Sequence, residues 1–110
     1  MIRLKVAQIA DIVGGTLNVE GNQEVWLAPV FDSRKATPGS FFLALVGEQA
    51  DGHSYIKDAL DNGAVFALVS KPVNYPNIKV DDVLVALGKL AAYVRLQLPN
   101  LKVIGITGSQ

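Results

Sequence analysis

The residues with a recognisable phosphate-binding pattern stand at the carboxyl end of the sequence. An apolar run, Leu101–Ile106, predicts a buried strand, and Thr107-Gly108-Ser109-Gln110 follows it. In a P-loop, a strand leads into a glycine-started turn whose backbone N–H groups bind phosphate at a helix N-terminus. The lysine and hydroxyl residue of that motif come several residues after the first glycine, and therefore after Gln110. Taken alone, this pattern favours an ordinary strand end over a nucleotide site.

A second candidate is Asp32-Ser33-Arg34, which follows a predicted strand and precedes the turn Pro38-Gly39. Strand ends are where α/β folds place ligand-binding groups. Arg34 offers a rigid fork of donors for phosphate, Ser33 can donate or accept, and Asp32 could hold Arg34 in position. The competing interpretation is a turn-capping aspartate with a solvated ion pair, which the three residues alone favour somewhat.

The third candidate is the glycine-flanked polar segment from Gly47 to His53. His53 is the only histidine of the chain, so a histidine-rich metal site is excluded. Glu48 and Asp51 could act as an acid–base pair, but no nucleophile or metal ligand stands near them in sequence. The segment is therefore interpreted as a binding surface and not as a catalytic centre.

The elements that would position these residues alternate between strand and helix. Apolar residues at helical spacing predict a helix over Val6–Val13, ended by Gly14-Gly15, and a longer helix that begins at Asp81 or Asp82 and ends before Pro99. A third helix is expected over Tyr55–Asn62, capped by Ser54 and stopped by Gly63. Strands are predicted over Thr16–Val19, Val25–Phe31, Ser40–Val46, Ala64–Val69, Ile78–Val80 and Leu101–Ile106. This pattern predicts an α/β fold with a mixed, partly parallel sheet flanked by helices.

Composition narrows the class of protein. The 110 residues contain ten basic and ten acidic side chains, which argues against a nucleic-acid or anionic-membrane surface. There is no cysteine, so disulfides and thiolate metal sites are excluded. No apolar run is long enough for a signal peptide or a membrane span. We therefore expect a cytoplasmic protein, most simply a monomer.

Together, these features resemble the Mur ligases of bacterial cell-wall synthesis. The resemblance spans nearly the whole chain and runs through Asp32-Ser33-Arg34, Pro38-Gly39, Phe42-Leu43-Ala44-Leu45, Gly47, Asp51-Gly52-His53, Gly63-Ala64 and Val103–Ser109. It implies the N-terminal domain type of these ligases for residues 1–100, which would bind the UDP part of a UDP-N-acetylmuramoyl-peptide. Residues 101–110 would then be the first strand and the truncated P-loop of the central ATPase domain.

The resemblance also implies site residues. The UDP-binding set would be Asp32, Ser33, Arg34, Gly47, Glu48, Asp51, Gly52 and His53, and the ATP-binding set Thr107, Gly108, Ser109 and Gln110. Neither a catalytic residue nor a metal ligand is expected within the chain. Ser54 and Tyr55 depart from the family pattern, in which an acidic residue and phenylalanine are frequent.

The implied reaction of the full-length enzyme is ATP-dependent amide formation through an acyl-phosphate, with ATP and Mg²⁺ as cofactors and none bound by this fragment. Its partners would be UDP-N-acetylmuramoyl-tripeptide and D-alanyl-D-alanine. Gly47-Glu48 and Thr107-Gly108-Ser109 favour this dipeptide-adding ligase over the one that adds the third residue of the peptide. A non-catalytic nucleotide-binding module and an α/β domain whose polar loops only cap the sheet remain alternatives.

Overall fold

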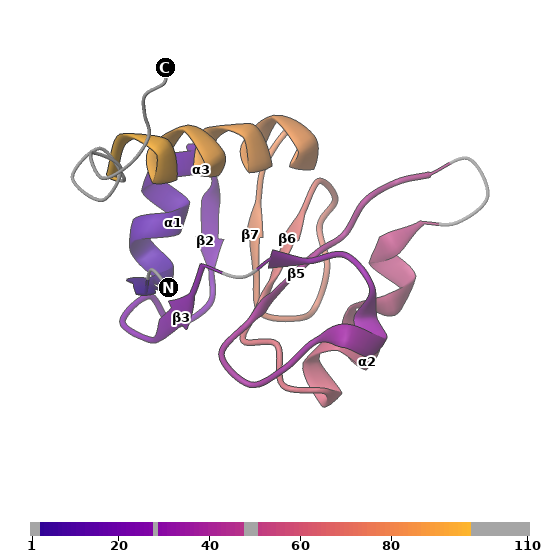
Figure 1. The fold of residues 1–110 in the computed structure, drawn as a ribbon. Helices are drawn as coiled ribbons and strands as arrows, with labels where there is room; N and C mark the ends of the chain where they lie inside the picture. Colours follow the sequence, from indigo (N-terminus) through magenta and orange to yellow (C-terminus); the bar gives the residue numbers. More distant parts are fainter. Residues whose placement is uncertain (1–2, 28, 48–50, 98–110) are drawn as a thin grey trace, which may run out of the picture.

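The computed structural model describes residues 3–27, 29–47 and 51–97, and its centre is a mixed five-stranded sheet (Figure 1). The strand order is β2-β7-β6-β5-β4. β4, β5, β6 and β7 are parallel neighbours, and β2 runs antiparallel to β7. The strands are β2 (Thr16–Asn18), β4 (Pro29–Val30), β5 (Phe41–Leu43), β6 (Ala67–Val69) and β7 (Asn77–Lys79). The predicted α/β fold with a partly parallel sheet is confirmed, and the predicted strand over Leu101–Ile106 lies outside the described residues.

A separate two-stranded sheet pairs β1 (Arg3–Lys5) with β3 (Glu24–Trp26) in antiparallel register. The prediction of one strand over Val25–Phe31 is therefore wrong, because this segment contributes β3 to the small sheet and β4 to the large one. Proline has no N–H for a sheet ladder, so it is tolerated at the first position of a strand or on a sheet edge. Pro29 occupies such a position at the start of edge strand β4.

One helix begins and ends where the sequence predicts, and a second begins where it predicts, while its predicted end before Pro99 borders residues outside the described ranges. α1 (Val6–Val13) ends at Gly14, whose φ of 67° lies in the left-handed region that glycine adopts without a steric penalty. α3 (Val83–Gln97) begins after Asp82, whose Oδ1 accepts hydrogen bonds from the N–H groups of Leu84 (2.9 Å) and Val85 (3.2 Å). Asp82 thus satisfies donors that the first helical turn leaves unpaired.

The third helix is shorter than predicted and is capped differently. α2 spans Ile56–Asp61 and follows a 3₁₀ turn, η2 (Gly52–Tyr55). The expectation that Ser54 caps this helix is wrong, because the Asp51 carboxylate accepts from the His53 N–H at 2.9 Å and so caps η2 instead. An aspartate accepts readily from the N–H two residues further on, which ends an extended segment in a turn.

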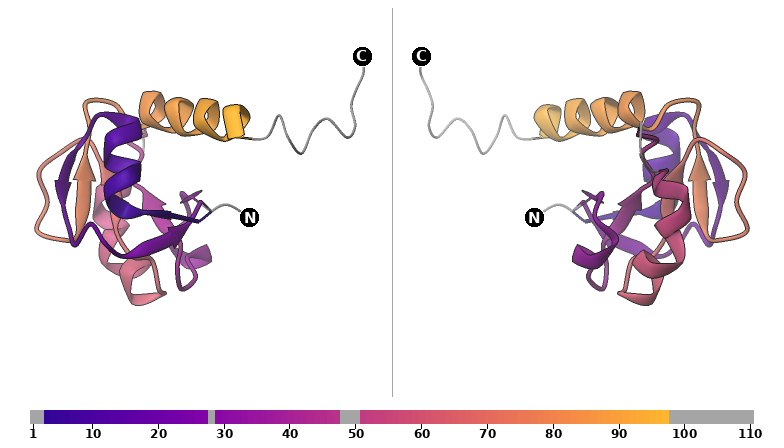
Figure 2. Two further views of the ribbon diagram at one scale, coloured as in Figure 1. Left: turned by 90° about the vertical axis from the view of Figure 1, so that its left-hand side faces the viewer. Right: turned by 90° about the vertical axis from the view of Figure 1, so that its right-hand side faces the viewer.

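The sheet is covered on both faces, as the continuous apolar run of β5 predicts. Phe41 and Leu43 face a cluster built with α1 and α3, in which the ring of Phe41 stacks on that of Phe66 with 5.0 Å between centroids. Phe42, which points the opposite way, packs in a second cluster with Ile56 and Ala59 of α2. In both views of Figure 2, α3 lies along the top of the fold above α1. The two clusters hold the parallel strands rigidly between helices.

Candidate functional site

One edge of the main sheet gathers most of the polar segments singled out in the sequence. Because β4, β5, β6 and β7 are parallel, their carboxyl ends lie at the same edge. Phe31–Arg34 follows β4, the segment that leads to Gly47 follows β5, and Ser70 follows β6. Ligands of open α/β sheets bind at this edge.

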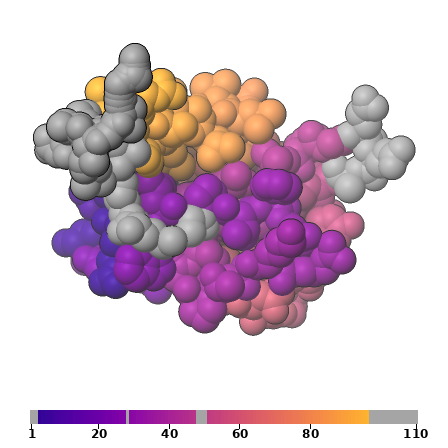
Figure 3. All heavy atoms as spheres, viewed as in Figure 1, coloured from indigo at the N-terminus to yellow at the C-terminus, as the bar shows by residue number. Residues whose placement is uncertain are grey.

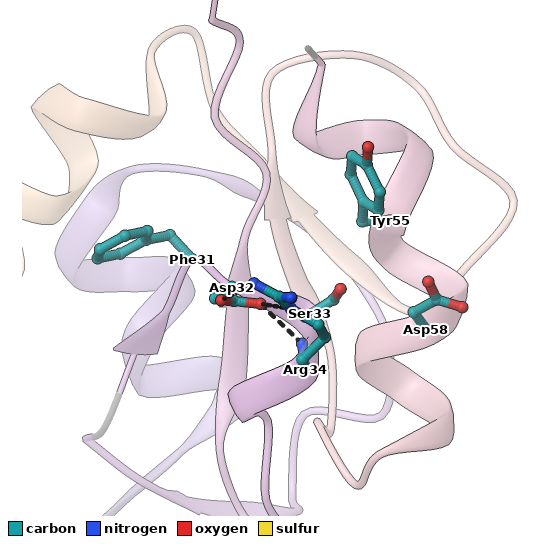
Figure 4. A pocket seen from close by; sticks show the side chains of 6 residues that line it. All are labelled: Phe31, Asp32, Ser33, Arg34, Tyr55 and Asp58. Carbon is teal, nitrogen blue, oxygen red and sulfur yellow. Dashed lines mark hydrogen bonds and ion pairs between the residues drawn. The ribbon is translucent and has the colours of Figure 1, made fainter.

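A pocket of about 510 Å³ lies beside the end of β4 (Figure 4). One wall is the segment Phe31–Arg34, and the other is formed by Tyr55 of η2 and Asp58 of α2. Both aromatic side chains are accessible, since Phe31 is 72% and Tyr55 46% exposed. Figure 4 shows the Asp32–Arg34 pair between them. The pocket therefore combines a cationic group, hydroxyl groups and two aromatic faces.

Asp32 holds Arg34 in place on the first wall of this pocket. It precedes the 3₁₀ turn η1 (Ser33–Lys35), and its Oδ1 accepts from the backbone N–H of Arg34 at 3.0 Å and from Nε at 3.1 Å. Oδ2 accepts from the guanidinium NH2 at 3.0 Å. The guanidinium and backbone N–H of Arg34 lower the pKa of Asp32 to about 2, and the same pairing raises the pKa of Arg34. Asp32 therefore caps the turn and pairs with an exposed arginine, as the competing interpretation expects, and it also orients Arg34; ligand binding by these residues stays a prediction.

The Arg34 side chain keeps donors available for a ligand. It is 86% exposed, and the pairing with Asp32 uses Nε and one N–H of NH2. A guanidinium has five N–H donors, so three remain directed away from the carboxylate. Such a pre-oriented fork is suited to an anionic group such as phosphate.

Ser33 ties the first wall of the pocket to the helix that carries the second wall. Its residue is 7% exposed, and its backbone carbonyl accepts from Asn62 Nδ2 at 2.9 Å. Asn62 directly follows α2, so this bond fixes the carboxyl end of α2 against η1. Nothing in the sequence identifies Asn62, because its partner is far away along the chain.

Asp51 and His53 of the predicted Gly47–His53 segment form a separate cluster, and neither lines this pocket. The His53 ring accepts from the Ser70 N–H through Nε2 at 3.2 Å, and its Nδ1 lies 2.6 Å from Asp51 Oδ1. Lys71 Nζ donates to the other oxygen of Asp51. These donors, with Lys71 first and the His53 backbone N–H next, hold the pKa of Asp51 well below its usual range.

Position 52 requires glycine because the backbone of Leu45 lies very close to it. Its N–H donates to the Leu45 carbonyl at 2.7 Å, and a Cβ at this position would lie 2.7 Å from the Leu45 nitrogen. In this structure Gly52 therefore allows the chain to pack closely against the end of β5. Glu48 lies outside the described residues, as do Thr107, Gly108, Ser109 and Gln110.

Sequence reasoning did not assign Phe31, Tyr55 and Asp58 to the site. The sequence predicts a strand that includes Phe31 and a helix that includes Asp58, and Tyr55 stands out only as a departure from the family pattern. The sequence offered one signal, because the aromatic residue Phe31 directly precedes Asp32-Ser33-Arg34. This signal points to the site only when the strand is known to end at Val30.

Neither a metal centre nor a membrane-spanning helix is found in the part of the chain that the structure describes. No group of three or more His, Cys, Asp or Glu side chains is arranged there to hold a metal ion. No helix within residues 3–27, 29–47 and 51–97 has the length and apolar character needed to cross a bilayer.

Comparison with known proteins identifies the family. The model of the Mur ligase family, described as its catalytic domain, matches residues 30–95, which is more than half of the chain. The chain belongs to the Mur ligase family. Over 99% of its length it is 40% identical to the UDP-N-acetylmuramoyl-tripeptide–D-alanyl-D-alanine ligase of Escherichia coli, of which it covers 24%.

Solved structures of the family show the same fold. The structure of MurF from Acinetobacter baumannii superposes with a TM-score of 0.79 over 90% of the chain, at 30% identity, and the match covers 22% of that protein. MurF ligase from Thermotoga maritima, solved in complex with ADP, matches 66% of the chain at 33% identity with a TM-score of 0.50, and 17% of that protein is covered. The chain thus spans about a quarter or less of the length of these family members.

Proposed function

We propose that this chain is the UDP-binding region of a Mur ligase that adds D-alanyl-D-alanine to UDP-N-acetylmuramoyl-tripeptide. The observation that carries the proposal is the pocket beside β4, in which Asp32 orients an exposed Arg34 between two accessible aromatic side chains. The 40% identity to a ligase with this named activity supports the choice of substrate. Residues 1–100 would form the UDP-binding domain, and residues 101–110 would begin the ATPase domain.

The chemistry of the pocket matches the parts of UDP. The free donors of Arg34 suit the diphosphate, and Ser33 can add a hydroxyl contact. Tyr55 and Phe31 offer faces on which uracil can stack, and stacking of a base on an aromatic side chain contributes about 1–3 kcal/mol. Asp58 carries a negative charge and therefore belongs with the ribose hydroxyls, which donate, and away from the phosphates.

UDP binding remains a prediction for Gly47, Glu48, Asp51, Gly52 and His53. His53 is 8% exposed at its side chain and both ring nitrogens have partners within the chain. Its contribution would therefore be indirect, through the loop that it fixes.

The remaining chemistry would belong to other parts of the full-length enzyme. ATP would bind at the P-loop that begins with Thr107, Gly108, Ser109 and Gln110, together with Mg²⁺ and groups beyond these residues. Among the described residues, no group of three or more His, Cys, Asp or Glu side chains is arranged to hold a metal ion. We propose that this chain alone has no ligase activity and does not hydrolyse ATP, and that the enzyme is a cytoplasmic monomer without nucleic-acid or membrane partners.

A titration with UDP, followed by amide ¹H–¹⁵N spectra of the ¹⁵N-labelled chain, tests the proposal. We expect shifts at residues 31–34, 55 and 58, and weaker binding of UMP and uridine because they lack the diphosphate. Arg34→Met should lower the affinity for UDP about tenfold and the affinity for uridine little, since hydrogen bonds to charged groups contribute about 1.5–3 kcal/mol.

Arg95→Met is the matched control, because Arg95 lies on α3 and does not line the pocket. It should leave the UDP affinity unchanged. The proposal fails if UDP causes no shifts around Arg34, or if Arg34→Met and Arg95→Met have equal effects.

A further inference from the structure

The hydrogen-bond partners of the His53 ring select one tautomer. A backbone N–H can only donate, so the 3.2 Å contact from the Ser70 N–H requires a lone pair on His53 Nε2. The proton of the neutral ring must then reside on Nδ1, which donates to Asp51 Oδ1 at 2.6 Å. The side chain is 8% exposed, so water cannot readily substitute for either partner.

This arrangement ties two separate segments of the fold together. Asp51 and His53 belong to the connection between β5 and α2, whereas Ser70 and Lys71 follow the end of β6. Lys71 Nζ donates to the second oxygen of Asp51, so both carboxylate oxygens have partners on this junction. We call the contacts of Asp51, His53, Ser70 and Lys71 the histidine junction. In Figure 3, the magenta described residues on either side of 48–50 stand at the edge of the visible face.

The histidine junction lies at the start of the segment that carries one wall of the pocket. His53 and Tyr55 belong to the same 3₁₀ turn, η2, which continues directly into α2 and Asp58. At the other end of α2, Asn62 donates to the carbonyl of Ser33 in the opposite wall. The helical segment that carries Tyr55 and Asp58 is therefore held at both ends, by His53 at its start and by Asn62 at its finish.

We propose that His53, as the neutral Nδ1–H tautomer held between Asp51 and the Ser70 N–H, is a positioning residue that sets the Tyr55 wall of the nucleotide pocket. The inference rests on the proposed binding of UDP in that pocket. His53 does not touch the nucleotide, and it acts by keeping Tyr55 at the distance from Arg34 that one ligand can span. Pre-organisation of this kind raises affinity because less ordering is left to occur on binding.

The tautomer is tested by long-range ¹H–¹⁵N spectra of the imidazole of the labelled chain at neutral pH. We expect a protonated Nδ1 and an unprotonated Nε2, the reverse of the tautomer that prevails in free histidine. A protonated Nε2 in the folded chain would overturn the proposal, because the Ser70 N–H would then have no acceptor.

The positioning role is tested with His53→Asn, which keeps a donor for Asp51 but is too short to reach Ser70. In the folded variant, verified by circular dichroism, the UDP affinity should fall about fivefold to tenfold, and the Tyr55 amide should exchange faster than in the parent chain. The control is Asp61→Asn, which breaks the exposed ion pair with Lys57 on the same helix and should change neither quantity.

The outcomes separate this inference from the proposed function. Unchanged UDP affinity in folded His53→Asn overturns the positioning role and leaves UDP binding intact. If the parent chain does not bind UDP at all, the proposed function fails, and Tyr55 amide exchange decides the positioning role. Equal exchange in the variant and the parent would then overturn it.

Discussion

Replacing Gly52 with alanine would press a methyl group into the backbone at the end of β5. A Cβ built on Gly52 lies 2.7 Å from the Leu45 nitrogen, 2.8 Å from the Leu45 oxygen and 3.1 Å from the Ala44 carbonyl carbon. All three are backbone atoms, so no side chain can rotate away to relieve the contact. The Gly52 N–H also donates to Leu45 at 2.7 Å, and any shift that relieves the clash lengthens this bond.

The expected loss is about 2 kcal/mol of unfolding free energy, since added methyl groups in packed sites cost about 1–3 kcal/mol. Gly88→Ala is the matched control, because it adds the same methyl group within α3, where nothing lies within 4 Å of the new Cβ. Alanine is favoured over glycine inside a helix by about 0.5–1 kcal/mol, so this variant should gain stability. The two substitutions therefore have opposite signs.

Urea denaturation monitored by far-UV circular dichroism measures both effects. With a urea slope near the middle of the usual range, about 2 kcal/mol per molar, Gly52→Ala should lower the midpoint by about 1 M, and Gly88→Ala should raise it by a few tenths of 1 M. The reasoning is refuted if Gly52→Ala has the same midpoint as the parent chain while Gly88→Ala shifts as expected. The backbone of Leu45 would then tolerate a Cβ at position 52.

Two further predictions concern acid stability and the core. Because the pKa of Asp32 falls from its ordinary 3.8 to about 2 on folding, the stability that its ionised form contributes is present above pH 4 and is lost as the pH falls towards 2. Asp32→Asn should flatten the loss of stability in that window, measured by urea unfolding at several pH values, and an unchanged pH profile would contradict this. Phe66→Ala should cost about 3–5 kcal/mol in thermal or urea unfolding, because Phe66 is fully buried and stacks on Phe41; a loss below about 1 kcal/mol would contradict it.

Local signals in the sequence were sufficient to predict several helices and strands of the fold. The helical spacing of Val6–Val13 and the glycine after it predicted α1 to the residue, and Asp82 was expected as one of two possible starts of α3. These elements are set by contacts between residues close in sequence, namely caps and apolar periodicity. The continuous apolar run of β5 likewise predicted a strand covered on both faces.

One error arose where partners far along the chain decide the outcome, and another where two local caps compete. Val25–Phe31 reads as one strand, yet its first part pairs with β1 and its last part with β5. Ser54 has the right residue type for a helix cap, but the Asp51 carboxylate, fixed by Lys71 and the His53 ring, caps the preceding turn instead. Propensity cannot distinguish these alternatives, since both are locally acceptable.

By itself, the sequence determined that the chain has a mixed α/β fold and the ordered motifs of the Mur ligase family, and it identified Asp32-Ser33-Arg34 as a ligand-binding candidate. Only the tertiary structure decided how these residues are grouped. It placed Phe31–Arg34 opposite Tyr55 and Asp58 in one pocket and joined Asp51 and His53 to Ser70 and Lys71 in a separate junction. The physical reason is that residue types and spacings specify which contacts a side chain can make, whereas the packing of α2 against η1 and β5 specifies which partners lie within reach.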